Sequence, residues 1–277
     1  MSTLVCVHAH PDDESILTAG TMGLAAHDGH RVVLVLATRG ELGEPVPGIL
    51  DDGEALGDRR EAETHRAAEV LGIERVEFLG YRDSGMMGDA TNDDPTCFWQ
   101  ADVDEAAGRL AAVLADVDAD VVTIYDDHGG YGHPDHIQVH RVGLRAAELA
   151  GVDAVFLATA NRDAMTRRAD DLAPDDLPEG VDPADLPAPP DDLDLSTFGT
   201  AEADITHAVD VRSVIGLKRS AMATHASQIA PDSFFLAMPE AVFGLAFGTE
   251  WYVAVGAPRP EGAPFATSLL PSAAPMA

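Results

Sequence analysis

The first 160 residues of this 277-residue chain alternate between short apolar runs and amphipathic stretches with helical spacing. The apolar runs lack polar–apolar alternation, which is typical of strands buried on both faces. Strands of this kind, separated by helices, form a parallel sheet covered by helices on both faces. The expected strands are 3–7, 31–38, 75–79, 120–125 and 152–157, and the expected helices are 15–27, 58–71, 103–114 and 134–149. We therefore expect an α/β fold with a mostly parallel sheet.

The chain changes character after residue 160. Residues 161–200 are dense in aspartate and proline with few apolar anchors, so we expect an acidic, proline-rich loop that is exposed or disordered. Residues 201–257 return to strand-like and helical stretches, and we expect them to complete the domain as a small C-terminal α/β annex to the core of residues 1–160. Residues 258–277 are rich in proline and alanine and are predicted to form a loose tail.

The charge of the chain excludes some classes of partner. Its 17 Lys and Arg residues stand against 48 Asp and Glu residues, a formal net charge of -31 that repels nucleic acid and anionic lipid. No apolar run is long enough for a bilayer, and the N-terminus lacks the basic region of a signal peptide. We expect a cytoplasmic protein that acts on a small molecule, and homo-oligomerisation stays open. Adaptation to a salty cytoplasm and a compositional bias explain the charge equally well.

A first polar cluster, HAHPDDE at residues 8–14, directly follows the first expected strand and opens the first helix. Pro11 suits the first helical turn, and the acidic residues sit near the positive end of the helix dipole. Taken alone, the cluster is explained as well by an acidic helix cap as by a functional site.

A second cluster, GGYGHPDH at residues 129–136, follows the fourth expected strand and also opens a helix. It repeats the His-Pro-Asp sequence of the first cluster, and alone it could be a capped helix with two solvated histidines. Both clusters fall at the carboxyl end of a parallel strand, where ligand sites of open α/β sheets gather. Their coincidence favours a shared site.

The combined clusters contain the donors of a catalytic zinc site. Two histidines and a carboxylate, His10, Asp13 and His136, would leave one coordination position for water. Asp12 is then a spare carboxylate beside the metal, which is what hydrolysis needs as a general base.

The two motifs in this order resemble the PIG-L/LmbE-like zinc-dependent N-deacetylases, which include the GlcNAc-phosphatidylinositol de-N-acetylases and the mycothiol-pathway deacetylases. The resemblance extends through TRGE at 38–41, RREAE at 59–63 and YRDSGM at 81–86, and it covers about the first 150 residues well. It implies a Rossmann-like sheet, which agrees with the alternation of elements. It also implies removal of an N-acyl group, typically the acetyl of an N-acetylglucosamine unit, from an amino sugar or sugar conjugate.

Residue by residue, the resemblance implies the following roles. His10, Asp13 and His136 match the family's ligands of Zn²⁺, for which Fe²⁺ is an alternative, and Asp12 matches its general base. His133 matches the residue that stabilises the oxyanion or protonates the leaving amine, Asp135 would orient it, and Tyr131 matches a mobile tyrosine near the carbonyl. Arg60 and Asp83 match positions that hold the polar groups of the sugar. By spacing alone, the last two could equally be a surface charge and a turn former.

Two other functions stay open at this point. One is an amidase acting on a thiol–sugar conjugate, although Ile16, Leu17 and Thr18 stand where that branch of the family is expected to carry a lysine. The other is a catalytically inactive sugar- or metal-binding module, which the intact Asp12 and His133 argue against. For His8 we expect packing in the core, and for His225 a satisfied polar contact.

Overall fold

The structure is a computed structural model that describes residues 1–166 and 197–270. Most of the predicted acidic loop of residues 161–200 therefore lies outside the described residues. Among the described residues, no helix is both long and apolar enough to cross a membrane.

One seven-stranded sheet runs through the described chain in the order β3-β2-β1-β4-β5-β7-β6. The strands from β3 to β5 are parallel, whereas β7 is antiparallel to β5 and β6 is antiparallel to β7. The mostly parallel α/β sheet predicted from the sequence is confirmed. The strands are β1 (Thr3–His8), β2 (Arg31–Leu36), β3 (Arg75–Phe78), β4 (Val121–Tyr125), β5 (Ala154–Thr159), β6 (His207–Asp210) and β7 (Thr249–Ala254).

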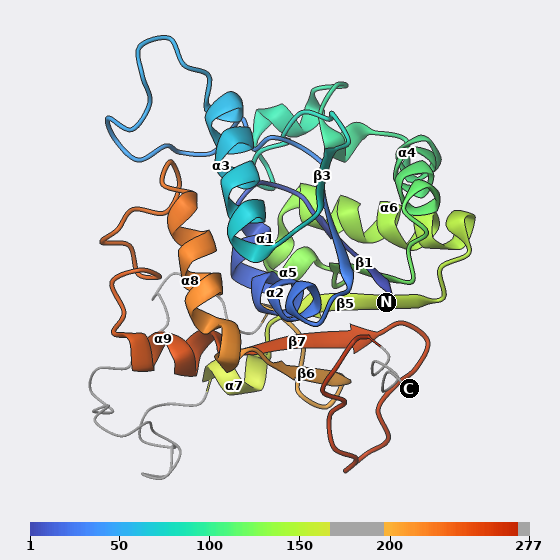
Figure 1. Cartoon of the computed structure of the whole chain (residues 1–277). Helices are drawn as coiled ribbons and strands as arrows, with labels where there is room; N and C mark the ends of the chain where they lie inside the picture. Colours follow the sequence, from blue (N-terminus) through green and yellow to red (C-terminus); the bar gives the residue numbers. More distant parts are fainter. Residues whose placement is uncertain (167–196, 271–277) are drawn as a thin grey trace.

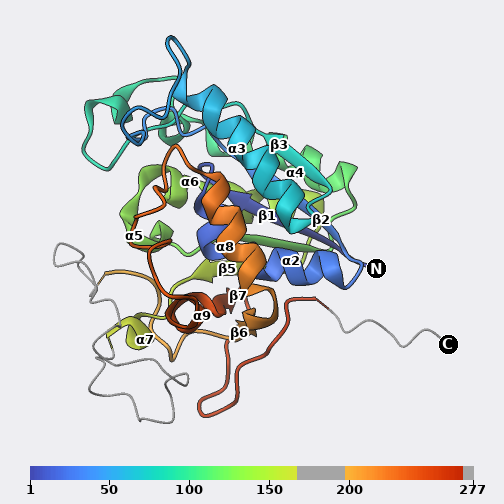
Figure 2. The same ribbon diagram turned by 60° about the vertical axis from the view of Figure 1, so that its left-hand side comes forward.

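Helices cover both faces of the sheet (Figures 1 and 2). Alternate residues of β1 point to opposite faces: Val5 and Val7 pack with residues of α4 and α6, whereas Leu4 and Cys6 pack with residues of α2, α3 and α8. The helices are α1 (Asp13–Leu17), α2 (Ala19–His27), α3 (Leu56–Leu71), α4 (Val103–Asp116), α5 (Gly129–Gly132), α6 (Pro134–Ala150), α7 (Arg162–Thr166), α8 (Ile215–Thr224) and α9 (Glu240–Phe247), with short 3₁₀ turns at η1 (Ala90–Asp93), η2 (Phe98–Gln100) and η6 (Arg212–Val214).

The expected helix 15–27 is two helices, because the chain breaks at Thr18. The hydroxyl of Thr18 binds the buried His8 ring at 2.8 Å, and its backbone angles are not helical. The first turn of α2 is capped by a residue distant in sequence. The backbone N–H groups of Gly20 and Thr21 each donate at 2.8 Å to the carboxylate of Glu250 on β7. Acidic groups at a helix N-terminus are favourable in this way.

The C-terminal part is joined to the core. Its strands β7 and β6 extend the main sheet, and α8 lies along α3 (Figure 1). The helical stretches of this part are the short turn η6 and the helices α8 and α9. Residues 258–270 differ from the loose tail that we expected: Arg259 donates to the carbonyl of Ile205 at 2.7 Å, and Leu269 is buried against the sheet.

The strand order reverses direction between β1 and β4, and we call the region outside the carboxyl ends of these two strands the crevice. These strands are neighbours, but β1 continues outward to β2 while β4 continues to β5 on the other side. The loops after them therefore diverge at the carboxyl edge of the sheet, which is where ligands bind in open α/β folds. Residues 9–12 follow β1 and residues 126–133 follow β4, so both His-Pro-Asp motifs border this crevice.

Candidate active site

The three side chains predicted to hold a metal meet in the crevice. His10 lies on the turn between β1 and α1, Asp13 is the first residue of α1, and His136 lies in the first turn of α6. One oxygen of Asp13, Oδ2, is 3.3 Å from His10 Nδ1 and 3.3 Å from His136 Nε2. Ligands of a tetrahedral zinc ion, each bound at about 2.0–2.2 Å, lie roughly 3.3–3.5 Å apart. The spacing therefore suits two edges of such a coordination shell.

The hydrogen bonds of the two imidazoles support a cation at this point. His136 Nδ1 is 3.2 Å from the carbonyl of Gly129, so that nitrogen carries the proton and Nε2 has a lone pair. His136 Nε2 is buried and has no hydrogen-bond partner among the described residues. His10 Nε2 is 3.2 Å from Asp135 Oδ2, which leaves His10 Nδ1 free to accept. A positive charge between these nitrogens and the Asp13 carboxylate, whether a metal ion or a proton on His10, would stabilise the arrangement. Against the lowering effect of burial, hydrogen bonds to Asp13, Asp135 and Asp83 raise the pKa of His10 well above its usual range, which shows how strongly the site favours positive charge at this point.

Two groups of candidate metal-binding side chains share His10, and neither of them includes Asp13. They are His10–His133–His136 and His10–Asp83–Asp135, whose donor atoms all lie within 4.8 Å of one another. His133 is the weaker ligand candidate, because its Nδ1 accepts the backbone N–H of Asp135 at 3.1 Å and its Nε2 therefore carries the proton. The set of His10, Asp13 and His136 is the one in which each histidine offers a lone pair.

Tyr125, the last residue of β4, was missed by the sequence analysis. Its hydroxyl donates to Asp13 Oδ2 at 2.8 Å and accepts from the backbone N–H of Ala9 at 3.1 Å. Its ring stacks on His136, with centroids 4.2 Å apart and planes 11° apart. His8, buried as expected, bonds to the same hydroxyl at 3.0 Å. One tyrosine thus orients a carboxylate and an imidazole of the predicted metal set, and its position at a strand end was the sequence signal.

Asp12, the predicted base, adopts an unusual backbone conformation beside Asp13. Its φ of 92° is positive, which among the described non-glycine residues is shared only with Asp118. Its carboxylate Oδ2 is 3.3 Å from Arg60 Nη2. Burial raises the pKa of Asp12 to about 6, against the lowering effect of the Arg60 guanidinium and with a further rise from the Asp13 carboxylate. A more basic carboxylate beside the metal set suits proton abstraction near neutral pH.

His133 caps helix α6 and keeps a donor N–H available. Because its Nδ1 accepts the Asp135 backbone N–H, the neutral ring carries its proton on Nε2. Burial lowers the pKa of His133 to about 3, and the neighbouring His10 and His136 lower it further from its usual range. The ring is therefore a neutral hydrogen-bond donor at physiological pH.

Asp135 orients a different histidine from the one predicted. Its side chain accepts from the hydroxyl and the backbone N–H of Ser84, the latter at 3.0 Å, and its Oδ2 binds His10 Nε2 at 3.2 Å. Only its backbone N–H contacts His133. The reason is helix geometry: an N-cap side chain is bonded by the backbone of the second helical residue, whose own side chain points away from it. Asp135 therefore holds His10 through Nε2, the ring nitrogen that does not contact Asp13.

Tyr131 lies at the rim of the crevice and is 45% exposed. Its ring meets that of His136 edge-on, with centroids 5.1 Å apart, and it also stacks loosely on Phe198. Burial of the hydroxyl raises the pKa of Tyr131, and the nearby Asp13 carboxylate raises it further. The phenol therefore stays protonated and can donate a hydrogen bond into the crevice.

The two residues predicted to hold the sugar also reach the site. Asp83 Oδ1 is 3.7 Å from His10 Nε2, and its oxygens accept backbone N–H groups of Leu42 and Gly85. Arg60 is only 4% exposed, and its terminal nitrogens donate to the carbonyl of Gly40 at 2.7 Å and that of Pro11 at 2.5 Å in addition to Asp12. Arg60 thus lies behind Asp12, and its contact with a sugar stays a prediction.

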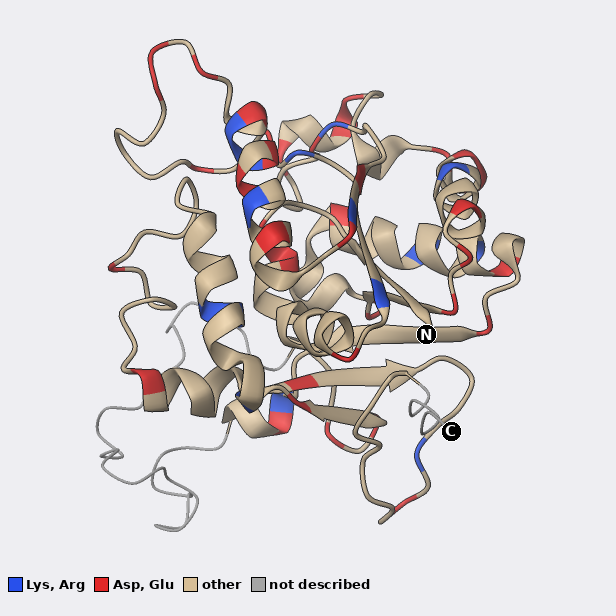
Figure 3. Cartoon of the chain, viewed as in Figure 1, with Lys and Arg blue, Asp and Glu red and all other residues tan. Residues whose placement is uncertain are grey.

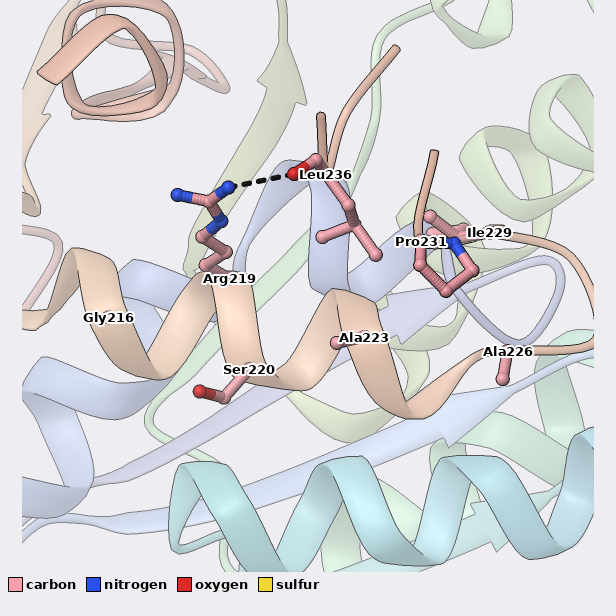
Figure 4. Close-up of a pocket in the computed structure, with 8 residues that line it drawn as sticks. All are labelled: Gly216, Arg219, Ser220, Ala223, Ala226, Ile229, Pro231 and Leu236. Atoms are coloured by element: carbon pink, nitrogen blue, oxygen red, sulfur yellow. Dashed lines mark hydrogen bonds between the residues drawn. The ribbon is translucent and has the colours of Figure 1, made fainter. Parts of the chain in front are cut away.

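A cavity of about 360 Å³ lies elsewhere, along α8 (Figure 4). Its wall includes Arg219, which donates to the carbonyl of Leu236 at 2.7 Å, and none of the predicted site residues lines it. The cavity is therefore separate from the crevice between β1 and β4.

Comparison with known proteins gives matches over nearly the whole chain. The model of the family described as "PIG-L: GlcNAc-PI de-N-acetylase" matches residues 5–147. The 1D-myo-inositol 2-acetamido-2-deoxy-alpha-D-glucopyranoside deacetylase of Acidothermus cellulolyticus is 40% identical, covering 94% of this chain and 91% of the relative. The enzyme of the same name from Salinispora arenicola is 41% identical, covering 95% and 88%. Among solved structures, N,N'-diacetylchitobiose deacetylase from Pyrococcus horikoshii has a similar fold, with a TM-score of 0.57 at 17% identity and coverage of 92% and 84%.

Proposed function

This chain belongs to the PIG-L family, and from that membership we propose that its substrate is a glycoside of N-acetylglucosamine and myo-inositol. The chain is an N-deacetylase of an amino-sugar conjugate. The observation that supports the inositol conjugate is the 40% identity to a relative named for it, which extends over 94% of the chain and well beyond the segment that the family model matches. The deacetylase names of these relatives favour this reaction over a thiol-conjugate amidase or an inactive binding module.

We propose that a divalent ion, zinc by its donor set, is held by His10, Asp13 and His136. The support is geometric: one carboxylate oxygen lies 3.3 Å from a lone-pair nitrogen of each histidine, and the nitrogen of His136 is otherwise without a partner among the described residues. When bound, such an ion supplies Lewis acidity that polarises an amide carbonyl and lowers the pKa of water. Asp135 holds His10 in place through a hydrogen bond. Tyr125 holds Asp13 through its hydroxyl and His136 through ring stacking.

The protein groups around the ion carry the proton and the charge. Asp12 accepts a proton from the water that attacks the acetamide carbonyl carbon. As the carbonyl oxygen becomes negative, the Nε2–H of His133 and the hydroxyl of Tyr131 are the donors available to stabilise it. The carbon–nitrogen bond then breaks, the amine nitrogen takes up a proton, and the acetic acid formed releases its own proton to the solvent, so that acetate and the free amino sugar leave. The proton gained by Asp12 balances the one that the amine needs.

The sugar lies, in this proposal, on the Asp83 side of the crevice. Asp83 already accepts two backbone N–H groups, but a carboxylate has about four lone-pair sites, so it can also accept from sugar hydroxyls. Arg60 borders the same region. Because its guanidinium contacts Pro11, Gly40 and Asp12, we assign it mainly to holding Asp12 in position.

A comparison of acetamide substrates tests the proposed specificity. The zinc-loaded protein would be assayed on the inositol glycoside of N-acetylglucosamine, on free N-acetylglucosamine and on N,N'-diacetylchitobiose, with released amine and acetate as readouts. We expect kcat/KM to be higher for the inositol glycoside by at least about tenfold, the effect of roughly 1.4 kcal/mol of added transition-state binding. Equal or higher kcat/KM for either of the other two sugars would contradict the proposal.

A further inference from the structure

The backbone of Asp12 is held in a conformation that the isolated chain disfavours. Its φ of 92° and ψ of -31° lie outside the regions that residues with a side chain usually occupy. Strained residues of this kind persist only where the surroundings hold them, and they cluster at active sites. The groups that contact Asp12 therefore indicate what keeps its carboxylate beside Asp13.

Glu14 supplies one of those contacts from within the same turn. The backbone N–H of Asp12 donates to Glu14 Oε2 at 3.0 Å. The other oxygen of Glu14 accepts from Ser15 Oγ at 2.6 Å and from His225 Nε2 at 2.7 Å. Glu14 and His225 are both fully buried, so this carboxylate is held between the base and a distant histidine.

His225 comes from the C-terminal part of the chain, outside the residues that the family model matches. It follows the last turn of α8, which packs against α1 and α3. The turn after it is anchored as well, because Ser227 donates through both its backbone N–H, at 3.0 Å, and its hydroxyl, at 2.6 Å, to Glu63 on α3. The position of His225 is therefore set by two buried polar contacts: its own hydrogen bond to Glu14 and the hydrogen bonds of the nearby Ser227 to Glu63.

We propose that Glu14 and His225 are positioning residues for deacetylation, which hold the backbone of Asp12 so that its carboxylate stays aimed at the crevice. Arg60 restrains the same residue from the other side, through the carbonyl of Pro11 and the Asp12 carboxylate. The C-terminal part thus completes the catalytic geometry of the N-terminal motif. This inference rests on the proposed role of Asp12 as the base.

Substitutions of His225 test the inference with a matched pair. His225→Gln keeps an N–H donor at nearly the place of Nε2, whereas His225→Asn has similar polarity but a side chain too short to reach Glu14. We expect His225→Asn to lower kcat by at least about tenfold, with KM and zinc content unchanged, and His225→Gln to recover most of that loss. Equal kcat values for the two variants would overturn the proposal, as would a loss confined to KM or to zinc content.

A double-mutant cycle shows whether His225 acts through Asp12. If it does, His225→Asn should have little further effect on kcat in an Asp12→Asn background, because the residue that it positions no longer works as a base. Multiplicative losses would show that His225 acts elsewhere and would overturn the inference. Full kcat in Asp12→Asn alone would instead contradict the proposed function. Should His225→Asn fail to fold, Glu14→Gln replaces it in the same cycle, and there too a multiplicative loss counts against the proposal.

Discussion

Tyr125 contacts two of the three side chains proposed to bind the metal, which makes its hydroxyl a sensitive point of the site. Tyr125→Phe removes the hydrogen bond to Asp13 but keeps the ring that stacks on His136. Because loss of a group that orients a ligand typically costs about 10- to 100-fold in metal affinity, we expect zinc to bind more weakly by that factor. Competition with a chelator measures the affinity.

Tyr81→Phe is the matched control for this change. The Tyr81 hydroxyl is also buried, but it has no hydrogen-bond partner among the described residues, so its removal should leave zinc affinity unchanged. Unchanged affinity in Tyr125→Phe as well would show that the hydroxyl does not orient Asp13.

Arg60 and its neighbour Arg59 allow a second test at single residues. The family resemblance implies that Arg60 binds the sugar, in which case its loss would raise KM, but the structure places its guanidinium against Pro11, Gly40 and Asp12. We therefore expect Arg60→Ala to lower kcat, by about tenfold or more, at constant zinc content. Arg59→Ala should change neither, because Arg59 pairs with Glu54. A pure KM effect of Arg60→Ala would restore the role predicted from sequence.

At the scale of elements, patterns within a short window were predictable and long-range contacts were not. The buried strands and the helix that ends at Gly72, a residue in the left-handed conformation that suits glycine, follow from local sequence. The break at Thr18 depends on a hydrogen bond to His8 and the cap of α2 on Glu250, and neither partner is visible in the local pattern. The docking of residues 258–270 likewise depends on β6, which pairs with Ala266.

The site follows the same rule. The two His-Pro-Asp motifs pointed to the proposed metal set and the proposed base because each motif is contiguous and follows a strand. The partners that orient them, Tyr125, Ser84 and His225, come from separate elements, and only the folded chain brings them together. The Asp135 side chain bonds to His10, and only the backbone N–H of Asp135 bonds to His133, since adjacency in sequence does not decide where a helical side chain points.

The acidic segment gives a prediction at this scale. Residues 168–194 lie outside the described residues, and the residues proposed to bind the metal lie between positions 10 and 136. The described residues on either side of it include a close pair, because the backbone N–H of Arg162 donates to the carbonyl of Thr200 at 3.0 Å. Replacing 168–194 by a short glycine–serine linker should therefore leave zinc content unchanged, as elemental analysis can show. Loss of zinc would mean that the segment supports the site.

For the whole molecule, the dominant property is its charge of -31. Figure 3 shows that Asp and Glu residues are spread over helices, strand ends and loops of the described chain rather than confined to one patch. Dispersed like charges repel, and added salt screens them as the Debye length falls from about 10 Å at 0.1 M to about 3 Å at 1 M. We therefore expect Tm to rise with sodium chloride over this range, as scanning calorimetry would record. A flat or falling Tm would show that the charges are already balanced locally.

The central claim is that Asp12 and Asp13, adjacent in sequence, perform different tasks. Asp13 contacts both histidines of the proposed metal set, whereas Asp12 contacts Arg60 and has a raised pKa of about 6. The most direct test measures zinc content and kcat on the same preparations of Asp12→Asn and Asp13→Asn. Asp12→Asn should keep its zinc and lose kcat by about 10²- to 10⁴-fold, the usual contribution of a general base. Asp13→Asn should lose zinc first, with activity partly restored by excess metal. Loss of zinc from Asp12→Asn with zinc retained in Asp13→Asn would show that the two roles are reversed.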